Sequence, residues 1–356
     1  MFVALRDLRF ARGRFVLIAA VVALITVLVG FLSGLTGGLA TQNVSAVLAL
    51  PADRLVFSAP GSGDAGPSFS DSSITEQQAA AWAATEGVAT VQPIGITQTR
   101  AEAGGTRAAI ALFGVPPGFA GTGPTDDGSL SLSVAAAAAL GVAAGDGVTI
   151  AGTAYTVESV EGDGWYSHTP VVQMTLSAWQ ASPAATGNPG TYATVLAVTG
   201  DPDWTETDAA TSTVSQAPLA SLTALSAFRS EIGSLLLMVA MLFGISALVI
   251  GAFFTVWTMQ RRSDIAVLKA LGASTASLVR DALGQALVVL VLGIGVGLCV
   301  VAAAGALAGS ALPFLLSPVT TLLPGAIMIV LGLAGAAFAL RSVTSADPLT
   351  ALGSNR

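Results

Sequence analysis

Hydrophobic positions are gathered into a few long runs rather than repeated at short intervals along the chain. One run extends from Phe15 to Ala40 and a second from Ile232 to Gln260, while a third, from Ala282 to Leu340, is interrupted by prolines. About 20 apolar residues suffice for a helix to cross a bilayer, so the third run holds two helices. The pattern predicts four transmembrane helices, at 15–38, 229–257, 280–308 and 321–340.

Residues 39–228, between the first two helices, follow a different pattern. Thr75 precedes a helical stretch that closes on a glycine, and residues 88–102 and 106–115 alternate as strands do. An alanine-rich helix and a hairpin with a turn at Gly145-Asp146 follow. The predicted fold class is a membrane α-helical protein with four transmembrane helices and a large extracytoplasmic α+β domain between helices 1 and 2.

The positive residues orient these helices. Ten of the 14 basic residues fall on one side: Arg6, Arg9, Arg12, Arg14, Arg261, Arg262, Lys269, Arg280, Arg341 and Arg356. That side is the cytoplasm, because cytoplasmic loops are enriched in Lys and Arg. It holds a basic N-terminal segment (1–14), a loop (258–279) and the C-terminus (341–356), with 309–320 as an outer loop. A cleaved signal peptide is the alternative for the first run, but its apolar stretch exceeds the usual length.

Composition excludes several classes of protein. Cys299 is the only cysteine, His168 the only histidine and Lys269 the only lysine, so structural zinc, iron–sulfur and Walker-type ATP sites are not expected within this chain. Nothing indicates a nucleic-acid partner or a resident cofactor. No convergent set of acid, base and nucleophile indicates an enzyme.

The polar segment at 258–275, "TMQRRSDIAVLKALGAST", is unusual in so apolar a chain. It predicts a short amphipathic helix that ends at Gly272, with Ser274 or Thr275 capping the next helix. The adjacent arginines also anchor the second transmembrane helix. An anchor alone needs no ordered apolar–basic helix, so we interpret the segment as a cytoplasmic contact for a separate motor protein.

Three motifs resemble the permease family of FtsX and MacB. These are the loop "RRSDIAVLKALGAS", the outer-domain stretch "LGVAAGDGVTIAGTAYTVESV" and the terminal "DPLTAL". The resemblance implies an ABC-type complex in a bacterial cell membrane, with a separate ATPase on the cytoplasmic face. Because ATP-binding subunits work in pairs, we expect a permease homodimer with two ATPases. The ATPase contacts implied, helped by the basic N-terminus, are Arg261, Arg262, Asp264, Ile265, Leu268 and Lys269.

One stretch, "GDGWYSHTPVVQMTLSAWQ", resembles heme-exporting permeases of Gram-positive bacteria, the HrtB type. Heme as the substrate rests on this resemblance and not on composition. His168 within the stretch invites a role as a heme ligand, but a lone histidine in an aromatic turn is more often structural.

Glu231, at the outer mouth of the second helix, is the other candidate heme-iron ligand. Ionisable residues at membrane depth are functional candidates, although Glu231 also suits a helix start, where it complements the dipole. Leu235 and Met238 follow on the same face of the helix. On the first helix, Thr26, Gly30, Ser33 and Gly37 form a stripe of small residues suited to close helix packing, and Val29 borders this stripe at a depth near that of Glu231. We predict an apolar slot open to membrane lipid, formed by Glu231, Leu235, Met238, Val29 and Ser33.

Other functions remain open on the sequence. Lipids, lipoproteins and antimicrobial peptides are alternative substrates of the same class of exporter. A mechanical relay to a cell-wall hydrolase, as FtsX implies, is an alternative of a different class. The size of the outer domain disfavours such a simple relay.

Overall fold

The chain divides into two compact units. The computed structural model describes residues 12–61, 66–183, 191–260, 267, 271–308 and 312–344. One unit, here the membrane unit, comprises Met1–Gly38 and Ser234–Arg356, and the other, the extracytoplasmic unit, comprises Leu39–Gly233. The described helices α2 and α8 each contribute residues to both units.

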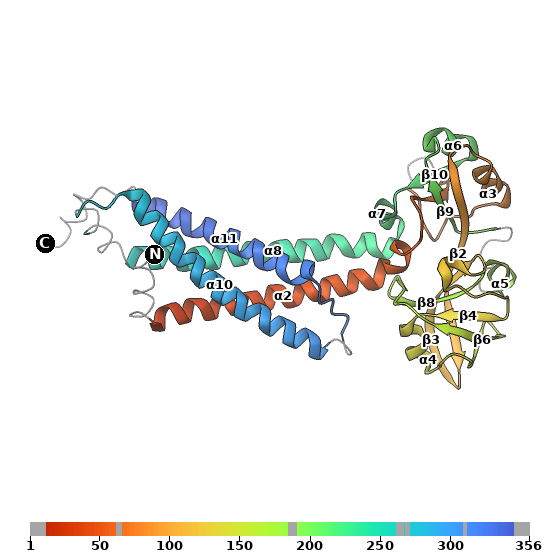
Figure 1. The fold of residues 1–356 in the computed structure, drawn as a ribbon, viewed down its shortest axis with the longest axis horizontal. Coiled ribbons are helices and arrows are strands. Elements are labelled where there is room, and N and C mark those ends of the chain that lie inside the picture. Colours follow the sequence, from red (N-terminus) through yellow and green to blue (C-terminus); the bar gives the residue numbers. More distant parts are fainter. Residues whose placement is uncertain are drawn as a thin grey trace. The chain divides into compact units, whose positions relative to one another are not determined.

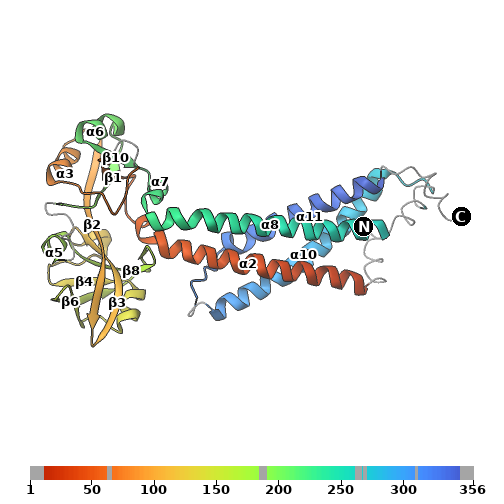
Figure 2. The same ribbon diagram turned by 180° about the vertical axis from the view of Figure 1, so that it is seen from behind.

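The membrane unit contains four helices that are long and apolar enough to cross a bilayer. Their bounds are α2 Arg12–Leu48, α8 Ser226–Gln260, α10 Thr275–Ala308 and α11 Pro318–Thr344. Figures 1 and 2 show them gathered in one bundle. Aromatic and aliphatic side chains from all four, Phe15, Phe254, Leu290 and Met328 among them, form the bundle's core. The predicted fold class is confirmed.

Close packing between α2 and α10 depends on two glycines. A Cβ built on Gly293 would lie 2.8 Å from the backbone oxygen of Ala19, and one on Gly297 would lie 2.5 Å from the Cβ of Thr26. Small residues four positions apart let two helix backbones approach closely within a membrane. Thr26 belongs to the predicted stripe of small residues, so this part of the stripe packs against α10 within the same chain.

Helix α11 begins earlier than the hydrophobic pattern predicts. Ser317 caps it, accepting a hydrogen bond from the backbone of Thr320 at 3.2 Å, and Pro318 occupies the first helical position, where a missing N–H costs nothing. Pro324 lies inside the helix. In membrane helices an internal proline is tolerated because neighbouring groups satisfy the freed carbonyl.

The extracytoplasmic unit is built on a ten-stranded sheet with the order β10-β1-β9-β2-β3-β8-β4-β6-β5, and β7 pairs with β8. Strand β2 divides this unit into two lobes, one with β1, β9 and β10 and the other with β3, β4, β5, β6 and β8. Figure 1 shows this long strand shared by the two lobes. The strand bounds are β1 Arg54–Ser58, β2 Val88–Ala103, β3 Thr106–Val115, β4 Ser129–Leu132, β5 Gly147–Ile150, β6 Thr153–Val160, β7 Trp165–Tyr166, β8 Thr169–Thr175, β9 Val195–Gly200 and β10 Thr213–Gln216.

One lobe closes on itself because β5 pairs with β2 as well as with β6. Along β3 the side chains alternate between two cores: Ile110 and Leu112 face the core of the closed lobe, whereas Ala111, Phe113 and Val115 face the other. A strand buried on both faces needs apolar residues at consecutive positions. The run "AIALFGV" provides them.

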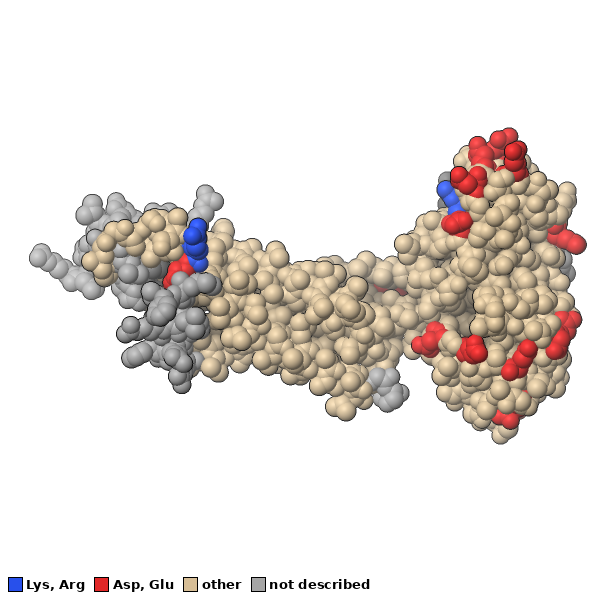
Figure 3. Space-filling view, in the orientation of Figure 1, with Lys and Arg blue, Asp and Glu red and all other residues tan. Residues whose placement is uncertain are grey.

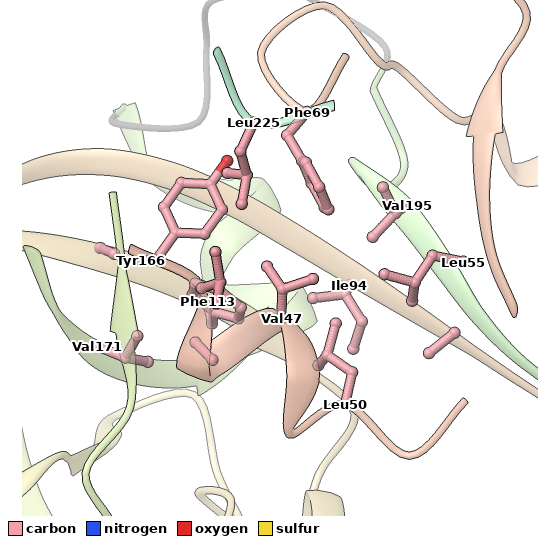
Figure 4. Packing of buried hydrophobic residues seen from close by; sticks show 14 of the residues in the cluster. Val47, Leu50, Leu55, Phe69, Ile94, Phe113, Tyr166, Val171, Val195 and Leu225 are labelled. Atoms are coloured by element: carbon pink, nitrogen blue, oxygen red, sulfur yellow. The ribbon is translucent and has the colours of Figure 1, made fainter. Parts of the chain in front are cut away.

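The second core joins the end of helix α2 to the sheet. Figure 4 shows Val47 of α2 and Leu50, two residues beyond the end of this helix, among side chains of the strands, with the Tyr166 ring near Phe69 and Phe113. The ring centroid of Tyr166 lies 5.9 Å from that of Phe69 and 5.7 Å from that of Phe113, both edge-on. Such pairs fix the position of β7, and with it the turn that follows.

Short helices cover the sheet. Their bounds are α3 Glu76–Ala83, α4 Val134–Leu140, α5 Leu176–Ala181, α6 Trp204–Thr211 and α7 Pro218–Ser221, with 3-10 turns at Phe119–Gly121 and Leu222–Ala224. Thr75 and Gln78 form a reciprocal capping box at the start of α3, so the predicted cap is confirmed. Gly141 ends α4 in the left-handed conformation, with φ of 70°.

Acidic side chains dominate the charged surface of the extracytoplasmic unit. Figure 3 shows them scattered over this unit, while the surface of the helices is almost uncharged between their ends. Residues 39–230 carry sixteen acidic and four basic residues. This unit therefore presents a negative surface.

Candidate functional site

Glu231 lies in the second turn of helix α8, which begins at Ser226. Its side chain is 43% exposed. Since the helix begins five residues earlier, Glu231 is too far along to cap it. The sequence alone allowed Glu231 to be a capping residue at the start of this helix, and the position of Glu231 within the helix excludes that role.

His168 lies in the two-residue turn between β7 and β8. Ser167 and His168 both have positive φ, at 47° and 63°, a combination that hairpin turns normally assign to Asn and Gly. Non-glycine residues adopt it only where surrounding contacts hold them. Two such contacts are present, because the Ser167 and His168 amides donate to the carbonyl oxygens of Asn43 and Gln42 on α2, at 2.9 and 3.0 Å.

A second set of bonds ties the same hairpin to α2. The hydroxyl of Ser45 accepts from the Trp165 amide at 2.9 Å. Tyr166, the next residue, is buried, and burial raises the pKa of its phenol. The hairpin is thus anchored on one side by helix α2 and on the other by the aromatic core.

These contacts bring His168, Glu231 and Asn43 together within the extracytoplasmic unit. His168 Nε2 lies 2.9 Å from Glu231 Oε2, and Asn43 Nδ2 donates to the same oxygen at 3.3 Å. Asn43 Nδ2 is also 3.4 Å from His168 Nε2. We call these three residues the outer polar cluster.

The proton positions in the outer polar cluster follow from the partners. A carboxylate only accepts, so Nε2 of His168 carries the proton that it shares with Glu231. Asn43 then also donates to Glu231, because its alternative orientation would set a carbonyl oxygen against the carboxylate. In that arrangement Asn43 Oδ1 is buried and finds no hydrogen-bond partner among the described residues.

The sequence nominated Glu231 and His168 separately and missed Asn43. Gln42 and Asn43 are the only side-chain amides in α2, and two amides in so apolar a helix could have marked the position. The pairing of His168 with Glu231 joins residues 63 positions apart, and no local pattern reveals it.

The other predicted substrate residues lie in the membrane unit. Val29 is 1% exposed and belongs to the core of the helix bundle, whereas Ser33 and Leu235 are half-buried and Met238 is 50% exposed. Val29 therefore faces inward within its own protomer, and Met238 is accessible. Their assignment to a substrate slot remains a prediction.

The residues predicted to contact the ATPase lie outside the described part of the chain: Arg261, Arg262, Asp264, Ile265, Leu268 and Lys269. Their flank is described. The Leu271 amide donates to the Val267 carbonyl at 3.0 Å, and Gly272 has a φ of 93°. The Ser274 hydroxyl accepts from the Ser277 amide, so the predicted cap of the next helix is confirmed. The amphipathic helix that Gly272 was predicted to end lies outside the described residues.

A cavity of about 370 Å³ opens in the extracytoplasmic unit beside the end of α2. Leu50, Phe113 and Phe119 form apolar walls, and the exposed carboxylates of Glu161 and Asp163 lie at its edge. Two carboxylates would repel the propionates of heme. Among the described residues, no group of three or more His, Cys, Asp and Glu side chains is arranged to hold a metal ion.

Comparison with known proteins finds similarity to membrane permeases. Residues 236–348 match the FtsX-like permease C-terminal family. A Staphylococcus haemolyticus relative named for hemin transport, the permease HrtB, is 26% identical over 99% of both chains. An ABC transporter permease of Mycobacterium bovis, uncharacterized by name, is also 26% identical over 99% of both.

Solved structures resemble about half of the chain. The periplasmic region of MacB from Actinobacillus actinomycetemcomitans matches 49% of this chain and 92% of its own, with 13% identity and a TM-score of 0.37. The extracellular domain of the transporter YknZ from Gram-positive bacteria matches 48% and 91%, with 16% identity and a TM-score of 0.33. By the family match over residues 236–348, the full-length relatives and the four apolar helices, the chain is similar to FtsX-like ABC transporter permeases and has the helices of a multi-pass membrane protein.

Proposed function

We propose that this permease exports heme, with Glu231 as an axial ligand of the heme iron during transport. The observation that carries the proposal is the Glu231 carboxylate itself, which is partly exposed at the outer end of a membrane-spanning helix. The full-length likeness to a permease named for hemin transport supports the choice of heme.

The chemistry of heme suits such a position. Heme is a flat and largely apolar macrocycle with an iron that takes axial ligands from protein side chains. A carboxylate offers an anionic oxygen to the iron. Below Glu231, Leu235 and Met238 follow on the apolar helix, and Met238 is half exposed. A heme that dissolves in the outer leaflet would meet this apolar surface before it meets the carboxylate.

Energy for export would come from ATPase subunits on the cytoplasmic face. We propose a homodimer of this chain with two copies of a separate ATPase, which grip the loop at 258–279. Helix α8 is continuous for 35 residues, which is about 52 Å at 1.5 Å per residue. A helix of that length can carry a displacement at its cytoplasmic end to Glu231, so the site would change when the ATPases close.

A heme titration tests the proposal. The purified homodimer would be titrated with hemin and followed by absorbance, for wild type, Glu231→Gln and Glu231→Ala. We expect a saturable Soret shift in wild type that both substitutions abolish, since neither replacement supplies an anionic oxygen to the iron. Glu86→Gln, which neutralises an exposed acid elsewhere in the extracytoplasmic unit, is the matched control and should titrate as wild type does.

Other outcomes would redirect the assignment. A shift that survives in Glu231→Gln keeps heme as the cargo and moves the iron ligand to another residue. The absence of any saturable shift in wild type contradicts heme transport. It would leave a lipid, lipoprotein or antimicrobial peptide as the cargo, or a mechanical relay as the function.

A further inference from the structure

In the outer polar cluster, one carboxylate oxygen of Glu231 is already engaged by two hydrogen-bond donors, and the proposed heme ligation does not explain this. The oxygen of Glu231 that meets His168 at 2.9 Å also accepts from Asn43 at 3.3 Å. A carboxylate oxygen that accepts two hydrogen bonds has less electron density to give to a metal. In the absence of substrate, therefore, His168 is hydrogen-bonded to the carboxylate that would bind the heme iron.

We propose that His168 is a competing partner for Glu231, which releases the carboxylate when a metalloporphyrin binds and takes it back when the porphyrin leaves. The proposal rests on the proposed function and adds to it a residue that controls substrate exchange. It assigns His168 a role through Glu231 and not as an iron ligand. The exchange involves no covalent step: the carboxylate oxygen moves from the Nε2 proton to the metal, and the imidazole turns to water.

The backbone around His168 supports such an exchange. Ser167 and His168 hold positive φ values of 47° and 63° only within the contacts that dock the turn on α2. Residues kept in sparsely populated conformations cost free energy, and they cluster at ligand sites and switch regions. The turn is therefore held against α2 at a cost that release would recover.

Hydrogen bonding within the cluster is also incomplete. Asn43 is 1% exposed, and its Oδ1 has no hydrogen-bond partner among the described residues. Buried polar atoms in native proteins are nearly always paired. An arrangement that leaves one unpaired is readily exchanged for another in which the amide finds a partner.

The interaction between His168 and Glu231 is weak enough to be broken when a porphyrin binds. The side chains of His168 and Glu231 are 31% and 43% exposed. Partly exposed ion pairs contribute little, so breaking this one costs a small part of the binding free energy. Removing the imidazole should accordingly tighten porphyrin binding by about two- to fivefold.

His168 can be observed directly because it is the only histidine in the chain. Protein labelled with 13C at histidine Cε1, and purified through a tag without histidine, gives one imidazole signal. In the porphyrin-free protein we expect Glu231→Gln to move this signal, since the charge acceptor is lost. An unmoved signal would overturn the pairing on which the proposal depends.

The exchange itself is tested by adding gallium(III) protoporphyrin IX, a diamagnetic analogue of hemin. We expect the wild-type imidazole signal to move to the position seen in Glu231→Gln as the porphyrin absorbance saturates. A signal that stays in place while the porphyrin binds overturns the exchange. Absence of binding contradicts heme transport, and the exchange with it, even where the pairing is seen in the porphyrin-free protein.

Affinity provides the second measurement. His168→Gly removes the imidazole and keeps the turn, because glycine adopts positive φ freely. Ser167→Gly is the matched control, with the same gain in backbone freedom and the imidazole intact. We expect the first variant to bind hemin about two- to fivefold more tightly than the second. Equal affinity would show that His168 does not compete, and weaker binding would show that it supports the ligand.

Discussion

At the scale of single residues, the sequence predicted local features such as helix caps, but not the contacts between residues far apart in the chain. Thr75 and Ser274 occupy the cap positions that their types favour, and Gly272 has a positive φ, which glycine adopts readily. Glu231 and His168 were each recognised as unusual, yet only the fold shows that they meet. Their contact depends on how a β-hairpin docks on a helix, which no pattern near either residue encodes.

Glycines that neighbour a tryptophan give a residue-scale prediction. Trp179 is 2% exposed, and a Cβ built on Gly114 would lie 2.4 Å from the Trp179 Cβ. Gly114→Ala should therefore overpack this core and lower the free energy of unfolding by about 1–3 kcal/mol. Thermal unfolding of the full chain, followed by tryptophan fluorescence, measures the loss.

Gly147→Ala is the control for that substitution. Gly147 also lies in a strand, but a Cβ there would meet its nearest neighbouring atom, the Tyr155 oxygen, at 4.0 Å. Its effect should stay within about 0.5 kcal/mol. Equal effects of the two substitutions would show that lost backbone freedom, and not contact with Trp179, determines their cost.

At the scale of elements, the hydrophobic runs located all four membrane helices but not their full lengths. α8 begins at Ser226 and α2 continues to Leu48, because helical turns beyond the bilayer need no apolar sequence. The strands at 88–103 and 106–115 were also readable from their alternation. Their order in the sheet was not, since β2 pairs with β9 and β5 across long stretches of chain.

Helix α10 offers a matched pair of glycines for an element-scale prediction. A Cβ on Gly297 would lie 2.5 Å from the Thr26 Cβ and 2.8 Å from the Ala23 backbone oxygen, whereas one on Gly295 would meet nothing within 4 Å. Gly297→Ala should separate α2 from α10 and destabilise the bundle by about 1–3 kcal/mol. Gly295→Ala should leave it unchanged.

Thermal stability in detergent, read from the monodisperse fraction that survives heating, distinguishes the two variants. The expected result is a clear fall in the melting midpoint for Gly297→Ala alone. If both variants behave as wild type, the contact between α2 and α10 is looser than the structure indicates, and the small residues of α2 have another role.

At the scale of the whole molecule, acidic and basic residues are concentrated in different parts of the chain. Acidic side chains are scattered over the extracytoplasmic unit (Figure 3) and outnumber its basic ones, whereas most basic residues fall in the segments assigned to the cytoplasm. This asymmetry was fully readable from the sequence, because it depends on counts and not on contacts. It also predicts where a motor protein would bind.

Arg261 and Arg262 carry the whole-molecule prediction. Both belong to the loop predicted to be cytoplasmic and lie outside the described residues, so their role is argued from charge and motif. Reversing both, as Arg261→Glu with Arg262→Glu, should abolish capture of the partner ATPase by the permease, because two attractive charges become repulsive. Arg107→Glu, which reverses an exposed charge in the extracytoplasmic unit, should leave capture intact.

The outcome must be separated from misfolding, since arginines beside a membrane helix also orient it. A double variant that retains the wild-type melting midpoint and still binds hemin, yet no longer captures the ATPase, supports a contact in this loop. Capture that persists at wild-type level would remove the loop from the interface. The basic residues before α2, Arg6 to Arg14, would then be the next to reverse, because they are the other cluster of positive charge on the cytoplasmic side.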